Sequence, residues 1–117
     1  MSKTDYLIKI QKNTLANFKR HKKITNKNSV VYHKEKINEP PRVGVAISKR
    51  AIKLAVIRNL IKRRIMEDFK IKSKSLYNVE VLVVISNKIY SEKNEISDIL
   101  MQEWKQSIKL LSKSYQQ

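Results

Sequence analysis

The chain has 117 residues, 41% of them hydrophobic, and a net charge of +16 from 26 Lys and Arg against 10 Asp and Glu. It contains no cysteine, which excludes disulfide bonds and thiolate metal sites. No apolar run approaches the roughly 18 residues of a membrane span. We expect residues 1–117 to form one domain with a core over about residues 7–112. We also expect a cytoplasmic location, because the first residues do not resemble a secretory signal.

The positive charge is unevenly distributed. Residues 1–79 hold 21 basic and 5 acidic side chains, whereas residues 80–117 hold five of each. Such an excess repels itself in a small domain, and a polyanionic partner relieves the repulsion. Nucleic acid is the first candidate and an anionic membrane surface the second, with a merely solvated, lysine-rich surface as the alternative. The asymmetry favours nucleic acid, because a genome that prefers Lys codons would not confine the excess to one part of the chain.

Hydrophobic periodicity predicts six or seven secondary-structure elements. The chain begins with a short helix over residues 13–22, followed by β structure over 23–36 that is centred on 29–33 and includes a turn or hairpin at 25–28. A strand over 42–48 and a helix over 54–72 come next. A β-branched strand over 79–86 and a helix over 91–113 complete the chain. In the last helix, the residues at helical spacing from Ile96 through Trp104 to Leu111 should line the core. This order fits an α+β domain in which helices pack on one side of a sheet.

The helix over 54–72 combines an apolar side with a cationic one. On a helical wheel Ile57, Ile61 and Ile65 share one side and should anchor the helix to the sheet. The opposite arc presents cations and an amide with no balancing acid, and like charges four residues apart repel each other. The residues of this arc are Arg58, Asn59, Lys62, Arg63 and Lys70, with Met66 among them and Arg64 on the other flank. A phosphate backbone would relieve the repulsion, so the arc predicts a nucleic-acid contact, to which Lys49, Arg50 and Lys53 just upstream add charge.

Two aromatic residues lie among basic residues. Phe18 is in the first helix and Tyr32 in the following β structure. Single-stranded bases stack on such rings with about 1–3 kcal/mol per base. Burial in the core is the alternative for each ring.

Catalytic motifs are missing from the sequence. A single glycine excludes a Walker loop, and we find no convergent carboxylates for a two-metal nuclease. We therefore predict no catalytic side chain, and the sequence leaves open whether any residue contacts a metal ion.

Residues 42–69, "RVGVAISKRAIKLAVIRNLIKRRIMEDF", resemble the protein subunit of bacterial ribonuclease P. The positions that match the signature of this family, including the strand and loop before the helix, are Gly44, Ser48, Lys49, Arg50, Arg58, Asn59, Lys62, Arg63 and Glu67. Leu60 and Met66 stand where the family has arginine. The order of the elements agrees from about residue 7 to residue 112.

The resemblance implies a two-layer α/β sandwich of order α-β-β-β-α-β-α with a left-handed β-α-β crossover, where general rules favour a right-handed one. It implies that a catalytic RNA removes the 5′ leader of precursor tRNA with Mg²⁺, while the protein, monomeric in a 1:1 complex, binds that RNA and the leader. The implied RNA-binding residues are Lys49, Arg50, Lys53, Arg58, Asn59, Lys62, Arg63 and Arg64. The implied residues of the leader cleft are Phe18, Tyr32, Ser48 and Met66.

Three other functions fit a basic domain of this size. A ribosomal protein or RNA chaperone would bind RNA without stimulating cleavage of precursor tRNA. A nuclease with its own active site would cut RNA unaided. A membrane-surface protein would bind vesicles, although the basic helix lacks the bulky aromatic face of such helices.

Overall fold

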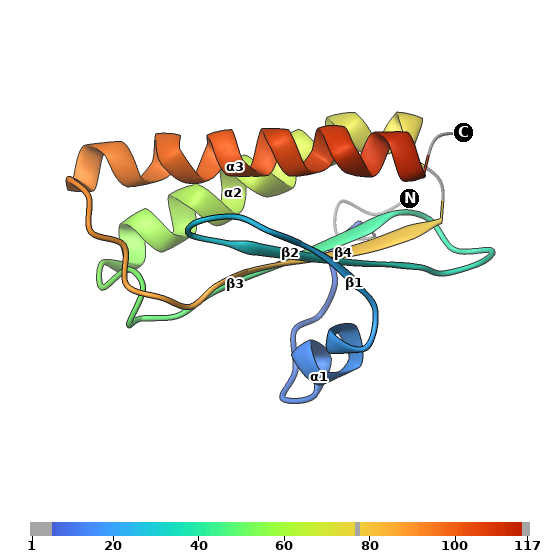
Figure 1. The fold of residues 1–117 in the computed structure, drawn as a ribbon, viewed down its shortest axis with the longest axis horizontal. Coiled ribbons are helices and arrows are strands. Elements are labelled where there is room, and N and C mark those ends of the chain that lie inside the picture. The colour runs from blue at the N-terminus through green and yellow to red at the C-terminus, as the bar shows by residue number, and fades with distance from the viewer. Residues whose placement is uncertain (1–5, 77, 116–117) are drawn as a thin grey trace.

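The computed structural model describes residues 6–76 and 78–115, which fold around one four-stranded sheet (Figure 1). The strands are β1 (Lys22–Thr25), β2 (Val30–Glu35), β3 (Arg42–Ile47) and β4 (Val79–Ile85). Their order in the sheet is β1-β2-β4-β3, with β2 antiparallel to both of its neighbours and β3 parallel to β4. Because β3 and β4 are parallel, their carboxyl ends meet at the same end of the sheet, with Ile47 beside Ile85.

The helices lie on both faces of the sheet. They are α1 (Thr14–Lys19), α2 (Ala55–Lys72) and α3 (Lys93–Ser114), with a short 3-10 turn, η1 (Ser73–Ser75), before β4. Figure 1 shows α2 and α3 side by side over one face and α1 under the other. The predicted α+β class and element order are confirmed. The expectation that the helices pack on one side of the sheet was wrong for α1, because Phe18 of this helix packs on the second face against Tyr32 and Leu82. The handedness of the β3-α2-β4 crossover stays a prediction.

Helix α2 is fixed to the sheet by a buried stripe. Ile61, Ile65 and Phe69 are almost completely buried in the main core. Ile57, which we predicted as an anchor, is only half-buried against this core, because the helix has just begun there and only a loop and the start of α3 lie beside it. The anchoring stripe is therefore displaced by one position toward the end of the helix, and Phe69 completes it.

A second apolar cluster lies on the face that α1 covers. Phe18 and Tyr32 pack there against Leu82 of β4. The segment before α1 also crosses this face, and Gly44 of β3 makes room for it: a Cβ atom at Gly44 would lie 3.2 Å from Cβ of Ile8. Gly44 is therefore required for close packing rather than for a special backbone angle.

The N-terminal segment also pairs with the outer edge of β3. The amide of Ile8 donates to the carbonyl of Val43 and the amide of Val43 donates to the carbonyl of Tyr6, both at 2.8 Å. The parallel bridge between Leu7 and Val43 continues the sheet by one short step. An edge strand that would otherwise expose its backbone groups is thereby covered.

A hydrogen bond between the side chains of His33 and Tyr115 joins β2 to the end of α3. His33 is buried, and its Nδ1 lies 3.0 Å from the hydroxyl of Tyr115. Burial, and then the positive charge of Lys22, lower the pKa of His33. Burial, and then the negative charge of Glu35, raise the pKa of Tyr115. Both side chains are therefore held in their neutral forms.

No helix in the described part of the chain combines the length and apolar character that crossing a membrane requires.

The buried stripe of α2 predicts a large difference between two isoleucines of one helix. Ile65 is 1% exposed and Ile71 is 67% exposed. Ile65→Ala should lower the free energy of unfolding by about 2–5 kcal/mol, because it removes buried methyl groups and leaves a cavity. Ile71→Ala should change it by less than about 0.5 kcal/mol. Urea denaturation of both variants measures the difference, and equal effects would contradict the assigned face of α2.

The His33–Tyr115 tie predicts a dependence of stability on pH. In the unfolded chain His33 takes up a proton near its ordinary pKa of 6.5, whereas burial lowers this pKa in the folded state. The contribution of His33 to the free energy of unfolding should therefore be fully present above pH 6.5 and should decrease as the pH is lowered through that value. Urea denaturation at about pH 7.5 and about pH 5.5 should show a smaller fall for His33→Gln than for the wild type. The variant His21→Gln, which removes an exposed imidazole, is the matched control and should keep the slope of the wild type.

Candidate nucleic-acid interface

The loop between β3 and α2 is built on Ser48. Its hydroxyl donates to the carbonyl of Ser86, at 3.2 Å, and accepts from the amide of Ala51, at 3.1 Å. The amide of Ser48 also donates to the carbonyl of Ile85. Ser48 therefore joins the ends of β3 and β4 and fixes the turn that follows. The cations carried by this loop, all exposed, are Lys49, Arg50 and Lys53.

Helix α2 continues this basic surface. Asn59 and Arg63 are exposed on the side of the helix that faces away from the core. Lys62 and Met66 are half-buried on the flank away from α3, and Met66 packs against the main core. The exposed side also carries apolar residues, Val56 and Leu60, so the cations do not form an unbroken row.

These cations lack acidic partners. Over residues 6–76 and 78–115, no carboxylate lies within 4.0 Å of the charged group of Lys49, Arg50, Lys53, Lys62 or Arg63. The ion pairs of the described chain occur elsewhere, mainly where β2 ends and β3 and β4 begin. There Glu80 lies 3.7 Å from Lys34, and Glu39 lies 3.9 Å from Arg42. Cations are thus neutralised at one end of the sheet and left unpaired at the other.

Two of the predicted RNA-binding arginines already hold protein partners. Arg58 donates from Nη1 to the carbonyls of Ile52, at 2.8 Å, and Lys53, at 2.7 Å. It therefore braces the loop that leads into α2. Arg64 faces α3, where it contacts the hydroxyl of Ser97 and pairs with Asp98 at 3.3 Å. The guanidinium groups of Arg58 and Arg64 are therefore engaged by other protein groups and are not the free donors that the predicted row required.

A groove lies where α2 passes the carboxyl ends of β3 and β4. Its volume is about 360 Å³, and its lining includes Ile10, Ala46, Ser48 and Lys62. Ala46 belongs to the face of the sheet that α1 covers, whereas Lys62 comes from the helical layer on the other face. The groove therefore passes around the β3 edge and joins an apolar floor to a cation.

The four predicted leader-cleft residues do not gather at one place. Phe18 and Tyr32 lie together on the α1 face, Met66 is in α2 on the opposite face, and Ser48 is at the end of β3. Phe18 is 3% exposed and Tyr32 9%, and Nζ of Lys34 lies 4.7 Å above the Phe18 ring. A base can reach either ring only if α1 or Lys34 moves. The role of these rings in leader binding therefore stays a prediction.

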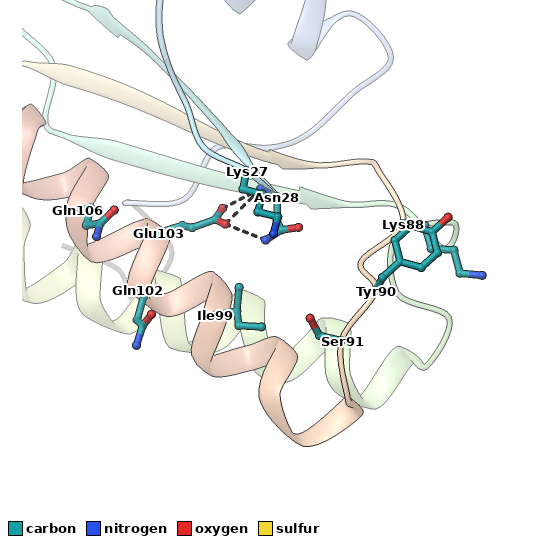
Figure 2. Close-up of a pocket in the computed structure, with 9 residues that line it drawn as sticks. All are labelled: Lys27, Asn28, Lys88, Tyr90, Ser91, Ile99, Gln102, Glu103 and Gln106. Atoms are coloured by element: carbon teal, nitrogen blue, oxygen red, sulfur yellow. Dashed lines mark hydrogen bonds between the residues drawn. The ribbon is translucent and has the colours of Figure 1, made fainter.

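Sequence reasoning missed one exposed aromatic residue. Tyr90, in the loop between β4 and α3, is 86% exposed and is the most exposed aromatic ring in the described part of the chain. It stands at the mouth of a cavity of about 480 Å³ between this loop, the β1–β2 turn and α3 (Figure 2). The signal in the sequence was weak: one Tyr in the polar stretch "SNKIYSEKN".

The described residues offer no protein metal centre. No three or more His, Asp or Glu side chains among residues 6–76 and 78–115 are placed to share a metal ion. These described side chains therefore form no all-protein cage for Mg²⁺.

Sequence comparison with known proteins matches this chain to the ribonuclease P protein family. A family model for ribonuclease P matches residues 3–111. The ribonuclease P protein component of Streptococcus agalactiae is 36% identical over 94 residues, which cover 80% of this chain and 84% of that protein. That of Pseudomonas putida strain GB-1 is 34% identical over 62 residues, which cover 53% of this chain and only 46% of the relative. The chain thus spans about half the length of this relative.

Solved structures agree with the sequence comparison. The ribonuclease P protein of Staphylococcus aureus superposes with a TM-score of 0.65 at 25% identity, over 92% of this chain and 93% of the other. Because the match extends over 92% of this chain, the likeness is not confined to the central motif. The chain therefore belongs to the ribonuclease P family of proteins.

Proposed function

We propose that this chain is the protein subunit of a ribonuclease P ribonucleoprotein and binds its catalytic RNA. One observation carries the proposal: among the described residues, Lys49, Arg50, Lys53, Lys62 and Arg63 of the basic loop and α2 have no acidic partner, and they lie within the span that the family model matches. Phosphates are the partners that unpaired, fixed cations favour. We assign this contact to Lys49, Arg50, Lys53, Asn59, Lys62 and Arg63. Arg58 supports it by bracing the loop, and Arg64 by tying α2 to α3.

The single-stranded 5′ leader of precursor tRNA is the proposed second ligand. The groove beside β3 supports this assignment, because it combines an apolar floor with the hydroxyl of Ser48 and the charge of Lys62. A flexible strand needs such a surface for its bases and phosphates. Of the four predicted leader-cleft residues, Ser48 lines this groove, whereas Phe18, Tyr32 and Met66 do not.

Bond cleavage is assigned to the RNA. The described residues do not gather the carboxylates that a two-metal nuclease uses, so we propose that RNA phosphates hold the Mg²⁺ ions. The protein would neutralise nearby phosphates and lower the magnesium concentration at which the RNA is active. A cytoplasmic protein, monomeric in a 1:1 complex, is the simplest form of this proposal.

Reconstitution tests the proposal. Addition of the protein to a bacterial ribonuclease P RNA should raise the rate of precursor tRNA cleavage when Mg²⁺ is limiting. The protein alone should leave the substrate intact. Tight RNA binding without stimulation would instead indicate a ribosomal protein or RNA chaperone, and cleavage by the protein alone would indicate a nuclease.

Lys62 and Arg58 should respond differently to removal of their charge. Lys62→Gln should weaken RNA binding and reduce the slope of log affinity against log salt concentration by about 1, while the thermal midpoint stays unchanged. Arg58→Gln should also lower the free energy of unfolding by about 1–3 kcal/mol, because two carbonyls of the loop lose their charged donor. Filter binding at several salt concentrations and thermal denaturation measure both effects.

The exposed Lys109 of α3 provides the matched control. Lys109→Gln removes one charge from the far side of α3 and should leave both the salt slope and the stability unchanged. If it weakened RNA binding as much as Lys62→Gln, the effect would reflect net charge alone, and the assigned interface would be wrong.

A further inference from the structure

We propose that Tyr90 and Lys88 form a stacking site for an unpaired RNA nucleotide, an inference that rests on the proposed function and extends its surface. The ring of Tyr90 is 86% exposed, so its face is accessible to a base, and aromatic rings with a polar tip are enriched where proteins contact partners. Nζ of Lys88 lies 5.4 Å from the ring centroid. An exposed ring with a cation beside it suits a base followed by its phosphate.

The cavity next to Tyr90 offers groups that recognise a base edge. Asn28, Gln102 and Gln106 contribute amide side chains to its lining, and Lys27 contributes a second cation. Figure 2 shows Asn28 between α3 and Tyr90, with Gln102 and Gln106 farther along α3 from the ring. Amides both donate and accept hydrogen bonds, as the Watson–Crick edge of an unpaired base requires. The volume of about 480 Å³ leaves room for one nucleotide.

The one carboxylate in this cavity is already occupied. Oε2 of Glu103 accepts from the amide of Asn28, at 3.1 Å, and from its side chain, at 2.9 Å, while Oε1 accepts from the hydroxyl of Ser29, at 2.6 Å. Glu103 therefore holds the β1–β2 turn against α3 and fixes one wall of the cavity. On the other side of Tyr90, Glu92 and Glu95 line a separate shallow cavity. These acids repel phosphate, so the backbone of a bound strand should follow the Lys27 and Lys88 side.

The Tyr90 site is continuous with the proposed RNA interface. The loop that carries Tyr90 follows β4, just as the basic loop follows β3, so both leave the same end of the sheet. Lys88 also lines a neighbouring cavity of about 420 Å³, together with Arg50, Lys53 and Lys93. The floor of that cavity is apolar, and it carries no acidic residue. One strand of RNA could therefore run from the basic loop to Tyr90 along the side lined by Arg50, Lys53 and Lys88.

Binding measurements with Tyr90 variants test this inference. Tyr90→Ala should weaken RNA binding by about 5- to 150-fold, the loss of one base stack, whereas Tyr90→Phe should bind as the wild type does because it keeps the ring. Both should keep the thermal midpoint of the wild type, since the ring is exposed. Ile37→Ala, which truncates another exposed apolar residue, is the control for surface changes.

Two RNAs distinguish the possible sources of the nucleotide. One is a bacterial ribonuclease P RNA without substrate, and the other is a short single-stranded oligoribonucleotide with the sequence of a tRNA leader. Loss of affinity for the first places the stacked base in the catalytic RNA, and loss for the second places it in the leader. Lys88→Gln should weaken binding to the same RNA and reduce its salt slope, whereas Lys109→Gln should not.

The outcomes separate this inference from the proposed function. If Tyr90→Ala binds both RNAs as tightly as the wild type, the stacking site is wrong even when the wild type stimulates cleavage. An equal loss in Tyr90→Phe would also overturn it, because the hydroxyl and not the ring would be responsible. Failure of the wild type to stimulate cleavage refutes the proposed function alone, since the oligoribonucleotide still reports on stacking at Tyr90.

Discussion

The burial of Ile61, Ile65 and Phe69 of α2 against the sheet is the constraint on which the rest of the molecule depends. Three large side chains on one stripe leave the helix no freedom to roll. Two contacts to α3 fix its remaining flank: Asp68 accepts from the indole nitrogen of Trp104, at 2.8 Å, and Arg64 pairs with Asp98. With two sides of α2 engaged, the fold itself sets the backbone positions of Asn59, Lys62 and Arg63. Under the proposed function, this preorganisation would lower the entropic cost of binding RNA.

The acidic side chains are distributed unevenly, so the two ends of the sheet differ in charge. Glu39 and Glu80 neutralise cations where β3 and β4 begin, whereas the loop after β3 carries three cations that pair with no carboxylate in the described chain. Ser48 ties these two loops through the carbonyl of Ser86. The parallel pairing of β3 and β4 therefore does more than build the sheet, because it brings the basic loop after β3 and the loop that carries Lys88 and Tyr90 to one end. An antiparallel pair would have sent them to opposite ends.

Local sequence patterns predicted the element order, the basic face of α2 and two of its three anchors. Phe69 follows Ile65 by four residues, so helical periodicity could have found it as well. The sequence left both base stacking and core burial open for Phe18 and Tyr32, and the choice depends on α1 and residues 8–10, which cross the same face of the sheet. The partners of Arg58 and Arg64 were equally hidden, since charge alone does not tell whether a guanidinium meets solvent, a loop carbonyl or a distant carboxylate. The exposure of Tyr90 depends on the path of a loop, which periodicity does not describe.

The short pairing of residues 6–8 with β3 has a consequence for self-association. A sheet has two outer strands, and the other one here, β1, is short and carries Lys22 and Lys23, whose charges discourage a second sheet from joining it. β3 carries mostly small and apolar residues and relies on the N-terminal segment for its protection. Proteolytic trimming to about residue 9 would uncover its amides and carbonyls. The trimmed protein would then have one unpaired edge strand, through which the sheets of two copies could pair.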